Sequence, residues 1–176
     1  HKLTPEVFAV WLRLLSQVPG SVLWLLGEAP AVQERLRALA QAQGVAPSRL
    51  IFTERRPLDR HLARHRLADL FLDTQPYNAH TTASDALWAG LPVLTCQGRS
   101  FAARVAASLL KAAGLPELVT HSLADYEARA LALATRPGEL AALRERLRRD
   151  GPSSPLFDTP RFARGIESAY HTMVDR

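Results

Sequence analysis

Three polar side chains in the middle of the chain stand where they could bind an anion. His80, Thr81 and Thr82 follow an expected short, fully buried strand at 70–72 and the turn-forming residues 73–78. A helix that begins at Thr81 would leave its first N–H groups without intrahelical partners, and its dipole would favour negative charge. The two hydroxyls and the imidazole add more donors than a single helix cap needs. The pattern predicts a phosphate-binding turn, but an ordinary strand–turn–helix with a threonine cap fits it equally well.

Other chemical patterns in the sequence are weaker. His61 and His65 stand four residues apart on one expected helix, a spacing that can bind zinc. Leu62 occupies the position where a zinc peptidase has its catalytic glutamate, and no third ligand is evident, so we expect no metal site. The glycine fingerprint of dinucleotide-dependent oxidoreductases is absent, and spacing alone supports no serine–histidine–aspartate arrangement.

Helical and strand patterns alternate along the chain. We expect helices at 5–17, 31–43, 57–66, 81–89, 101–113, 123–134, 137–149 and 159–174, and strands at 21–26, 50–53, 70–72, 93–96 and 118–120. This alternation predicts an α/β fold, a Rossmann-like and mainly parallel sheet with helices on both faces. Ligands of such folds bind at the carboxyl ends of the strands, where Thr53, Asp73 and Cys96 fall. Trp11, Trp24 and Trp88 lie in apolar contexts and are expected in the core.

Composition limits the class of protein. The 176 residues suffice for one α/β domain, and 47% hydrophobic with 22% charged residues is ordinary for a globular protein. The net charge of +5 comes from dispersed arginines without interleaved aromatic residues, so we expect no nucleic-acid partner. No apolar run is long enough for a membrane helix, and a single cysteine in an apolar strand suits a reducing compartment. We therefore expect a cytoplasmic protein without a membrane partner.

The two ends of the chain differ from its middle. Residues 151–155 read as a stiff, non-regular linker, followed by a lone helix. We expect residues 1–150 to form the ligand-binding domain, and residues 151–176 to form a linker and a helix that packs against something other than that domain's sheet. The first helix also lacks a preceding strand to complete a βαβ unit, which suggests a piece of a longer protein.

Several motifs carry a family resemblance. The strings HTTASDALWAGLPVLT, FAARVAASLL and SSPLFDTPRF resemble the C-terminal catalytic half of the O-linked N-acetylglucosamine transferases, in a bacterial type of homologue. This family includes the Spindly-type O-fucosyltransferases, and the match is collinear from about residue 1 to the last helix. The resemblance implies the C-terminal half of a GT-B fold, with an N-terminal catalytic half and tetratricopeptide repeats elsewhere in the protein. It also implies metal-independent, inverting transfer of a sugar from a nucleotide diphosphate to a serine or threonine hydroxyl of a protein or peptide acceptor.

The resemblance also assigns roles to residues. Lys2 matches the catalytic lysine that contacts the diphosphate and supports the leaving group, a role that suits a compact, flexible ammonium. The positions that match nucleotide-sugar contacts are Leu26, Arg56, His61, Arg64, Tyr77, His80, Thr81, Thr82 and Asp85.

These matched positions divide by the part of the donor that they would contact. Leu26 and the backbone of Arg56 match the base site, and Asp85 matches a carboxylate that binds the ribose. Tyr77 matches the lining of the donor-sugar pocket. The other matched histidines, threonines and arginine would contact the nucleotide and its phosphates.

The sequence departs from the family at two positions and leaves the chemistry open. Ala79 replaces a glycine that often precedes the His-Thr-Thr motif, and Leu58 replaces a family lysine in the loop before His61. UDP-N-acetylglucosamine is the expected donor, with GDP-fucose as the alternative, and no cofactor is expected. A nucleotide-sugar epimerase of GT-B fold and a catalytically silent nucleotide-sugar-binding module remain alternative functions.

Overall fold

The fold is built from parallel strands that connect through helices. A computed structural model describes residues 2–27 and 29–174 of the chain. Within these residues β1 (Leu23–Leu26) pairs with β2 (Leu50–Thr53), and β4 (Val93–Cys96) lies between β3 (Phe71–Leu72) and β5 (Val119–Thr120). Every one of these pairings is parallel, as the alternating pattern predicts. The described strands form two separate sheets rather than the single sheet expected.

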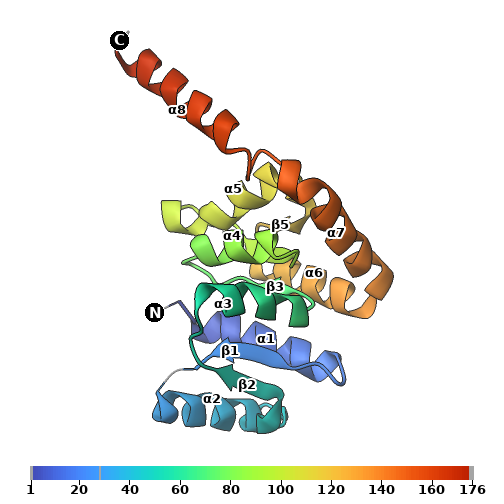
Figure 1. Cartoon of the computed structure of the whole chain (residues 1–176). Helices are drawn as coiled ribbons and strands as arrows, with labels where there is room; N and C mark the ends of the chain where they lie inside the picture. Colours follow the sequence, from blue (N-terminus) through green and yellow to red (C-terminus); the bar gives the residue numbers. More distant parts are fainter. Residues whose placement is uncertain (1, 28, 175–176) are drawn as a thin grey trace.

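Helices connect the strands at nearly all the expected places. They are α1 (Pro5–Gln17), α2 (Pro30–Ala42), α3 (Leu58–Arg64), α4 (Thr81–Trp88), α5 (Val105–Ala112), α6 (Leu123–Thr135), α7 (Pro137–Asp150) and α8 (Thr159–Val174). Short 3-10 turns are η1 (Pro47–Arg49), η2 (His65–Leu67), η3 (Phe101–Ala103), η4 (Pro116–Leu118) and η5 (Gly151–Ser153). Figure 1 shows α2 and α3 on opposite sides of β1 and β2. Among the described residues, no helix has the length and apolar character needed to cross a membrane.

The hydrophobic core connects α1 to the three-stranded sheet of β3, β4 and β5. Helix α1 begins after Thr4, whose hydroxyl accepts a hydrogen bond from the backbone N–H of Val7, and it buries seven residues along one side. It packs against α6, which in turn contacts β4 and β5. Trp11 of α1 donates from its indole nitrogen to the hydroxyl of Tyr126 on α6, 3.2 Å away and buried. The N-terminal helix is thereby fixed to the sheet that ends at the candidate site.

Several expected elements differ in extent or burial. The strand expected to be fully buried at 70–72 is only half-buried, because β3 pairs with β4 alone and so lies at a sheet edge. The expected helix at 57–66 ends its last turn as 3-10. The helix expected at 101–113 is divided at Arg104, whose φ of −121° departs from helical values. Trp11 is buried as expected, and Trp24 is half-buried.

The C-terminal segment is ordered against the domain and then leaves it. Residues 151–153 form a 3-10 turn rather than the non-regular linker expected, and this turn contacts α4. Trp88, expected in the core, is 58% exposed, and its ring lies edge-on to Phe157 with centroids 5.0 Å apart. Beyond that contact α8 projects away from the rest of the molecule, and it has no buried residue (Figure 1).

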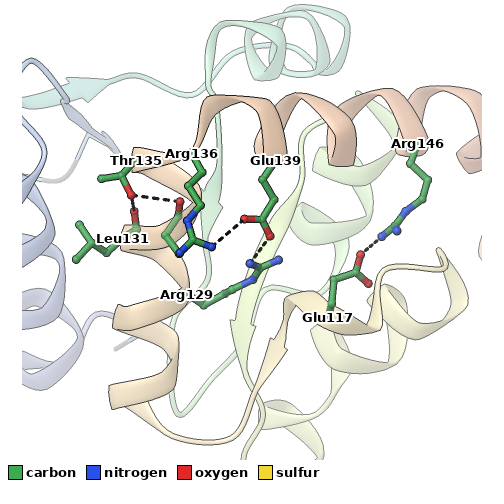
Figure 2. Close-up of polar contacts among 8 residues, drawn as sticks. Glu117, Arg129, Leu131, Thr135, Arg136, Glu139 and Arg146 are labelled. Atoms are coloured by element: carbon green, nitrogen blue, oxygen red, sulfur yellow. Dashed lines mark hydrogen bonds and ion pairs between the residues drawn. The ribbon is translucent and has the colours of Figure 1, made fainter.

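Ion pairs bind α7 to its neighbours. Figure 2 shows Glu139 at the start of α7 between two arginines. Arg129 of α6 lies 2.5 Å from its carboxylate and Arg136 lies 3.9 Å from it. Farther along α7, Arg146 pairs with Glu117 of η4. The arginines of α7 are thus engaged with neighbouring carboxylates, as expected of a solvated helix face.

Candidate functional site

A buried carboxylate organises the turn that follows β3. One oxygen of Asp73, Oδ1, accepts hydrogen bonds from the backbone N–H groups of Thr74, at 2.8 Å, and Ala79, at 2.7 Å. The other, Oδ2, accepts a 2.6 Å bond from the hydroxyl of Thr95 on β4. The Asp73 side chain is therefore bonded to both ends of the turn and to the neighbouring strand. Burial raises its pKa to about 6, although these hydrogen bonds and the charge of Lys2 act in the opposite direction.

A second loop packs against the same turn. The backbone N–H of Asn78 donates to the carbonyl of Ala102, at 2.9 Å, and the Asn78 amide donates to the Thr74 carbonyl, at 2.8 Å. Gly98 allows this loop to fold tightly, because a Cβ there would lie 2.7 Å from the Cβ of Ala103. The turn from Thr74 to Ala79 is thus held by the sheet on one side and by this loop on the other.

The turn ends at the amino terminus of α4. The helix begins at Thr81, as the sequence predicts, but its capping residue is His80 rather than a threonine. His80 makes no side-chain capping hydrogen bond within the described residues, and both Thr81 and Thr82 are exposed. The first N–H groups of α4 and the two hydroxyls are therefore available to an anion.

Aromatic and basic side chains stand beside this helix start. The Tyr77 ring stacks on the His80 ring, with centroids 5.1 Å apart and planes 21° apart. The ammonium of Lys2 lies 4.4 Å from the centroid of the Tyr77 ring and donates to the carbonyl of Asn78, at 3.3 Å. A cation from the N-terminal segment is thus placed next to the predicted anion site, 75 or more residues away in sequence.

A second group of predicted residues spans α3 and α4. Arg64 donates to Nδ1 of His61, at 2.8 Å, so a neutral His61 carries its proton on Nε2. That nitrogen lies 3.7 Å from a carboxylate oxygen of Asp85. Burial, then the charges of His65 and Arg64, lower the pKa of His61, while Asp85 acts to raise it. His61 is therefore neutral near pH 7 and has one N–H directed toward Asp85.

A cavity of about 530 Å³ lies beside Arg64, at the carboxyl end of β2. It is lined by Trp24, Phe52, Thr53, Glu54, Arg56, Arg60, Arg64 and Leu67. The indole nitrogen of Trp24 donates to the Thr53 hydroxyl, at 2.7 Å, and the Arg64 guanidinium lies 5.9 Å from the Trp24 ring. An arginine-rich cavity with aromatic walls suits a planar or anionic group.

The structure brings most of the predicted site residues into two adjoining groups. Lys2, Tyr77, His80, Thr81 and Thr82 gather at the turn and the start of α4. The second group joins α3 to α4 and consists of His61, Arg64 and Asp85.

The remaining predicted residues lie at the edges of the site. Arg56 lines the cavity, and Leu26, which ends β1 opposite Thr53, is 39% exposed. Leu58, which replaces the family lysine, is 65% exposed at the start of α3.

The structure also bears on the zinc alternative and on residues that sequence reasoning did not single out. His65 uses its Nδ1 on the carbonyl of His61, and the described residues contain no group of three or more histidine, cysteine, aspartate or glutamate side chains that could hold a metal. Asp73 and Asn78 shape the site, yet the sequence indicated only that both belong to the turn at 73–78 and that Asp73 stands at a strand end.

The chain is similar to one family of known proteins, the glycosyl transferases of family 41. A family model described as "Glycosyl transferase family 41" matches residues 1–166. The chain is 42% identical to the probable UDP-N-acetylglucosamine–peptide N-acetylglucosaminyltransferase SEC of Arabidopsis thaliana, over 98% of this chain and 18% of that protein. It is 36% identical to a Caenorhabditis elegans enzyme of the corresponding name, over 100% of this chain and 15% of the relative.

A solved structure matches the fold. A mutant of the Thermobaculum terrenum O-GlcNAc transferase superposes with a TM-score of 0.90 at 37% identity, over 98% of this chain and 34% of that chain. The chain thus spans about a third of the solved protein and less than a fifth of each of the two curated relatives.

Proposed function

The chain belongs to glycosyl transferase family 41, and we propose that it is the donor-binding part of a protein O-glycosyltransferase. The donor is UDP-N-acetylglucosamine, and the acceptor is a serine or threonine hydroxyl of a protein or peptide. The observation that carries this proposal is the open amino terminus of α4 beside the Lys2 ammonium. Support for the donor and the reaction comes from the names of the relatives in Arabidopsis thaliana and Caenorhabditis elegans.

The two groups of residues divide the work on the donor. The diphosphate is bound by the N–H groups at the start of α4 with His80, Thr81 and Thr82. Asp85 binds the ribose, and its neighbours His61 and Arg64 contact the nucleotide.

The remaining site residues bind the two ends of the donor. The base lies toward Leu26 and the backbone of Arg56, near the arginine-rich cavity. Tyr77 lines the space for the sugar, since its ring stacks on His80 at the phosphate end of the site.

Lys2 is the catalytic residue of the proposal. Transfer with inversion breaks the bond between the anomeric carbon and the diphosphate oxygen while the acceptor hydroxyl oxygen attacks from the opposite face and releases its proton, so the products are the glycosylated acceptor, UDP and a proton. Negative charge then grows on the leaving diphosphate, and the Lys2 ammonium stabilises it. This charge takes the place of a metal ion, so the proposed enzyme requires no metal cofactor.

We also propose a partner for the exposed apolar side chains of α8. Its exposed apolar side chains recur at helical spacing on one stripe, Phe162, Ile166, Tyr170 and Met173. We assign this stripe to contact with a part of the same protein outside residues 1–176, its N-terminal catalytic half, because the solved relative is about three times as long. In the full-length protein Ile166→Glu should lower the melting temperature, and Ser168→Glu, on the opposite side of α8, should leave it unchanged. Equal effects of the two variants would contradict this contact.

Nucleotide binding tests the donor proposal. In the full-length protein, His80→Ala and the Thr81→Ala/Thr82→Ala double variant should each weaken UDP binding by about 1.5–3 kcal/mol, the range for hydrogen bonds to a charged group. Calorimetry measures the affinity, and circular dichroism checks that each variant is folded. Thr135→Ala is a matched control, because that exposed hydroxyl bonds only within α6 (Figure 2). Unchanged affinity in the site variants would overturn the assignment.

Product analysis separates the alternative functions. Full-length protein incubated with UDP-N-acetylglucosamine and an acceptor peptide should give glycosylated peptide and UDP. An altered nucleotide sugar without acceptor would indicate an epimerase, and binding without any product would indicate a silent module. Either result would contradict the proposed transfer.

A further inference from the structure

We propose that Asp73 is the positioning residue of the anion-binding turn, and that it holds the turn as a carboxylate anion. This inference rests on the proposed function, because the turn matters only if a diphosphate binds at the start of α4. It assigns a role in donor binding to a residue that is itself buried.

The hydrogen bonds of Asp73 define the geometry of the turn. A single oxygen accepts from Thr74, the first residue of the turn, and from Ala79, the last residue before His80. This arrangement fixes the distance between the two ends of the turn and sets where α4 begins. The second oxygen is bonded to Thr95, so the turn keeps a fixed position relative to β4. Bonds to an ionised acceptor are about twice as strong as bonds to a neutral one.

Asp73 also interacts with Tyr126 and with Lys2. Its backbone carbonyl accepts a 3.0 Å hydrogen bond from the Tyr126 hydroxyl, which connects the strand end to α6. The charge of Lys2 acts on the Asp73 carboxylate and favours its ionised form. A carboxylate at this point therefore attracts the ammonium that the proposed mechanism uses, and keeps it at the turn.

The position is costly for a structural residue. Burial raises the pKa of Asp73 to about 6, which means that the ionised side chain is less favourable here than in water. A neutral side chain of the same shape would avoid that cost. A buried ionisable group with a shifted pKa beside a candidate site is typical of functional sites, which is consistent with a role of this charge in the site.

The other ionisable groups around Asp73 do not replace it as the titrating group. Tyr126 on α6 and Cys96 on β4 both have pKa values raised by burial, so both are neutral near pH 7. Lys2 comes from the N-terminal segment, and His80 follows the turn. Loss of the Asp73 charge removes one of the causes that raise the pKa values of Tyr126 and Cys96, but burial, the largest cause, remains, so both groups stay neutral in the variant.

Asp73→Asn is the central test, in the full-length protein with UDP-N-acetylglucosamine. The amide oxygen can still accept from the two backbone N–H groups, while the negative charge is lost. We expect donor affinity about tenfold weaker at pH 7.5, together with a melting temperature at or above that of the unaltered protein. The difference in affinity should shrink toward zero as the pH falls through about 6, where Asp73 itself becomes neutral. The diphosphate of this donor does not titrate in that range.

Two further variants keep the result interpretable. The hydrogen bond from Thr95 to Oδ2 lowers the pKa of Asp73. Thr95→Val removes this bond and should therefore raise that pKa, so the midpoint of the pH dependence of donor affinity should move to higher pH. Asp125→Asn makes the same chemical change at an exposed carboxylate that bonds to Ser122, and it should leave both affinity and pH dependence unaltered.

The outcomes distinguish this inference from the proposed function. If the unaltered protein does not bind the donor, the proposed function fails and this inference fails with it. If the unaltered protein binds and Asp73→Asn binds as tightly at every pH, the inference alone is overturned. If Asp73→Asn lowers affinity and melting temperature together, with no change in pH dependence, then Asp73 is a structural residue and the inference is also overturned.

Discussion

The ammonium of Lys2 lies over the ring of Tyr77, 4.4 Å from its centroid, and donates a hydrogen bond to the carbonyl of Asn78. This relationship places a residue from the second position of the chain at a turn more than 70 residues later. The contacts hold the cation beside the start of α4. In the proposed mechanism, little reorganisation would then be needed when negative charge develops on the leaving diphosphate.

Replacement of Lys2 should therefore affect chemistry more than folding. Lys2→Ala in the full-length protein should lower turnover by about 10²-fold or more, because the charge that stabilises the leaving group is lost. The melting temperature should change little, since Lys2 is only half-buried and precedes α1. Steady-state transfer to an acceptor peptide measures the effect.

The controls for Lys2 address both the residue and the metal. Lys111, the only other lysine in the sequence, is exposed on α5, and Lys111→Ala should retain full activity. A chelator should leave the unaltered rate unchanged, because Lys2 provides the charge that a metal would supply. Loss of activity with chelator, or normal turnover by Lys2→Ala, would refute this mechanism.

Tyr126 couples the first helix to the strand end that carries Asp73. Its buried hydroxyl accepts from the Trp11 indole and donates to the Asp73 carbonyl. Tyr126→Phe leaves two buried polar groups without partners, so we expect a loss of about 1–3 kcal/mol in the free energy of unfolding. Urea unfolding measures it, and Thr172→Val, which removes an exposed hydroxyl that bonds within α8 and lies off the apolar stripe, should cost nothing detectable. A Tyr126→Phe protein as stable as the unaltered one would show that these bonds contribute no net stability.

The ionisation of Asp73 should appear in the pH dependence of stability. Its pKa is raised from 3.8 to about 6 in the folded protein, so the folded state binds more protons than the unfolded state between these values. The free energy of unfolding therefore falls as the pH rises through this window, by about 3 kcal/mol for this group. Asp73→Asn should match the unaltered protein below pH 4 and exceed its stability by up to that amount at pH 7. Urea unfolding at a series of pH values measures the free energy of unfolding of both proteins. Parallel plots of this free energy against pH would contradict the prediction.

Much of the fold could be predicted from local patterns. The boundaries of α1 agree with expectation because Thr4 and Pro5 give a cap and a first turn that need no tertiary contact. The break at Arg104 could not be read in the same way. It accompanies the bonding of Ala102 to Asn78, which brings the preceding loop onto the turn, and that contact spans more than 20 residues.

Burial was harder to predict than element type. Trp88 stands in an apolar sequence, yet it is exposed because α4 ends at the surface, where Phe157 covers only part of the ring. The division of the strands into two sheets likewise depends on which edges pair, which the strand patterns do not encode.

In the candidate site, too, the features that depend on local sequence could be predicted, and those that depend on contacts between distant residues could not. The helix start at Thr81 follows from turn residues and an apolar strand, and the structure confirms it. The role of Lys2 followed only from the family resemblance, since a terminal lysine has no distinguishing pattern. The importance of Asp73 depends on bonds to Ala79 and Thr95, which become neighbours only in the folded chain. A cytoplasmic location and the absence of a nucleic-acid partner stay predictions.

Asp85 offers the sharpest test of how the nucleotide lies in the site. Its carboxylate is 3.7 Å from Nε2 of His61, and we propose that it accepts hydrogen bonds from the ribose hydroxyls. Asp85→Ala should weaken UDP binding by about 1.5–3 kcal/mol, the range for hydrogen bonds to a charged group. Asp125→Ala, at an exposed carboxylate on α6, is the matched control and should bind normally.

A thermodynamic cycle separates contact with the ribose from an indirect effect through His61, whose pKa would fall further without Asp85. Calorimetry compares UDP with its 2′,3′-dideoxy analogue in the unaltered protein and in Asp85→Ala. If Asp85 binds the ribose, loss of the hydroxyls weakens binding to the unaltered protein but has little effect on the variant, because the interaction is already gone. If removal of the hydroxyls weakens both proteins equally, the two changes are independent, and Asp85 does not contact the ribose.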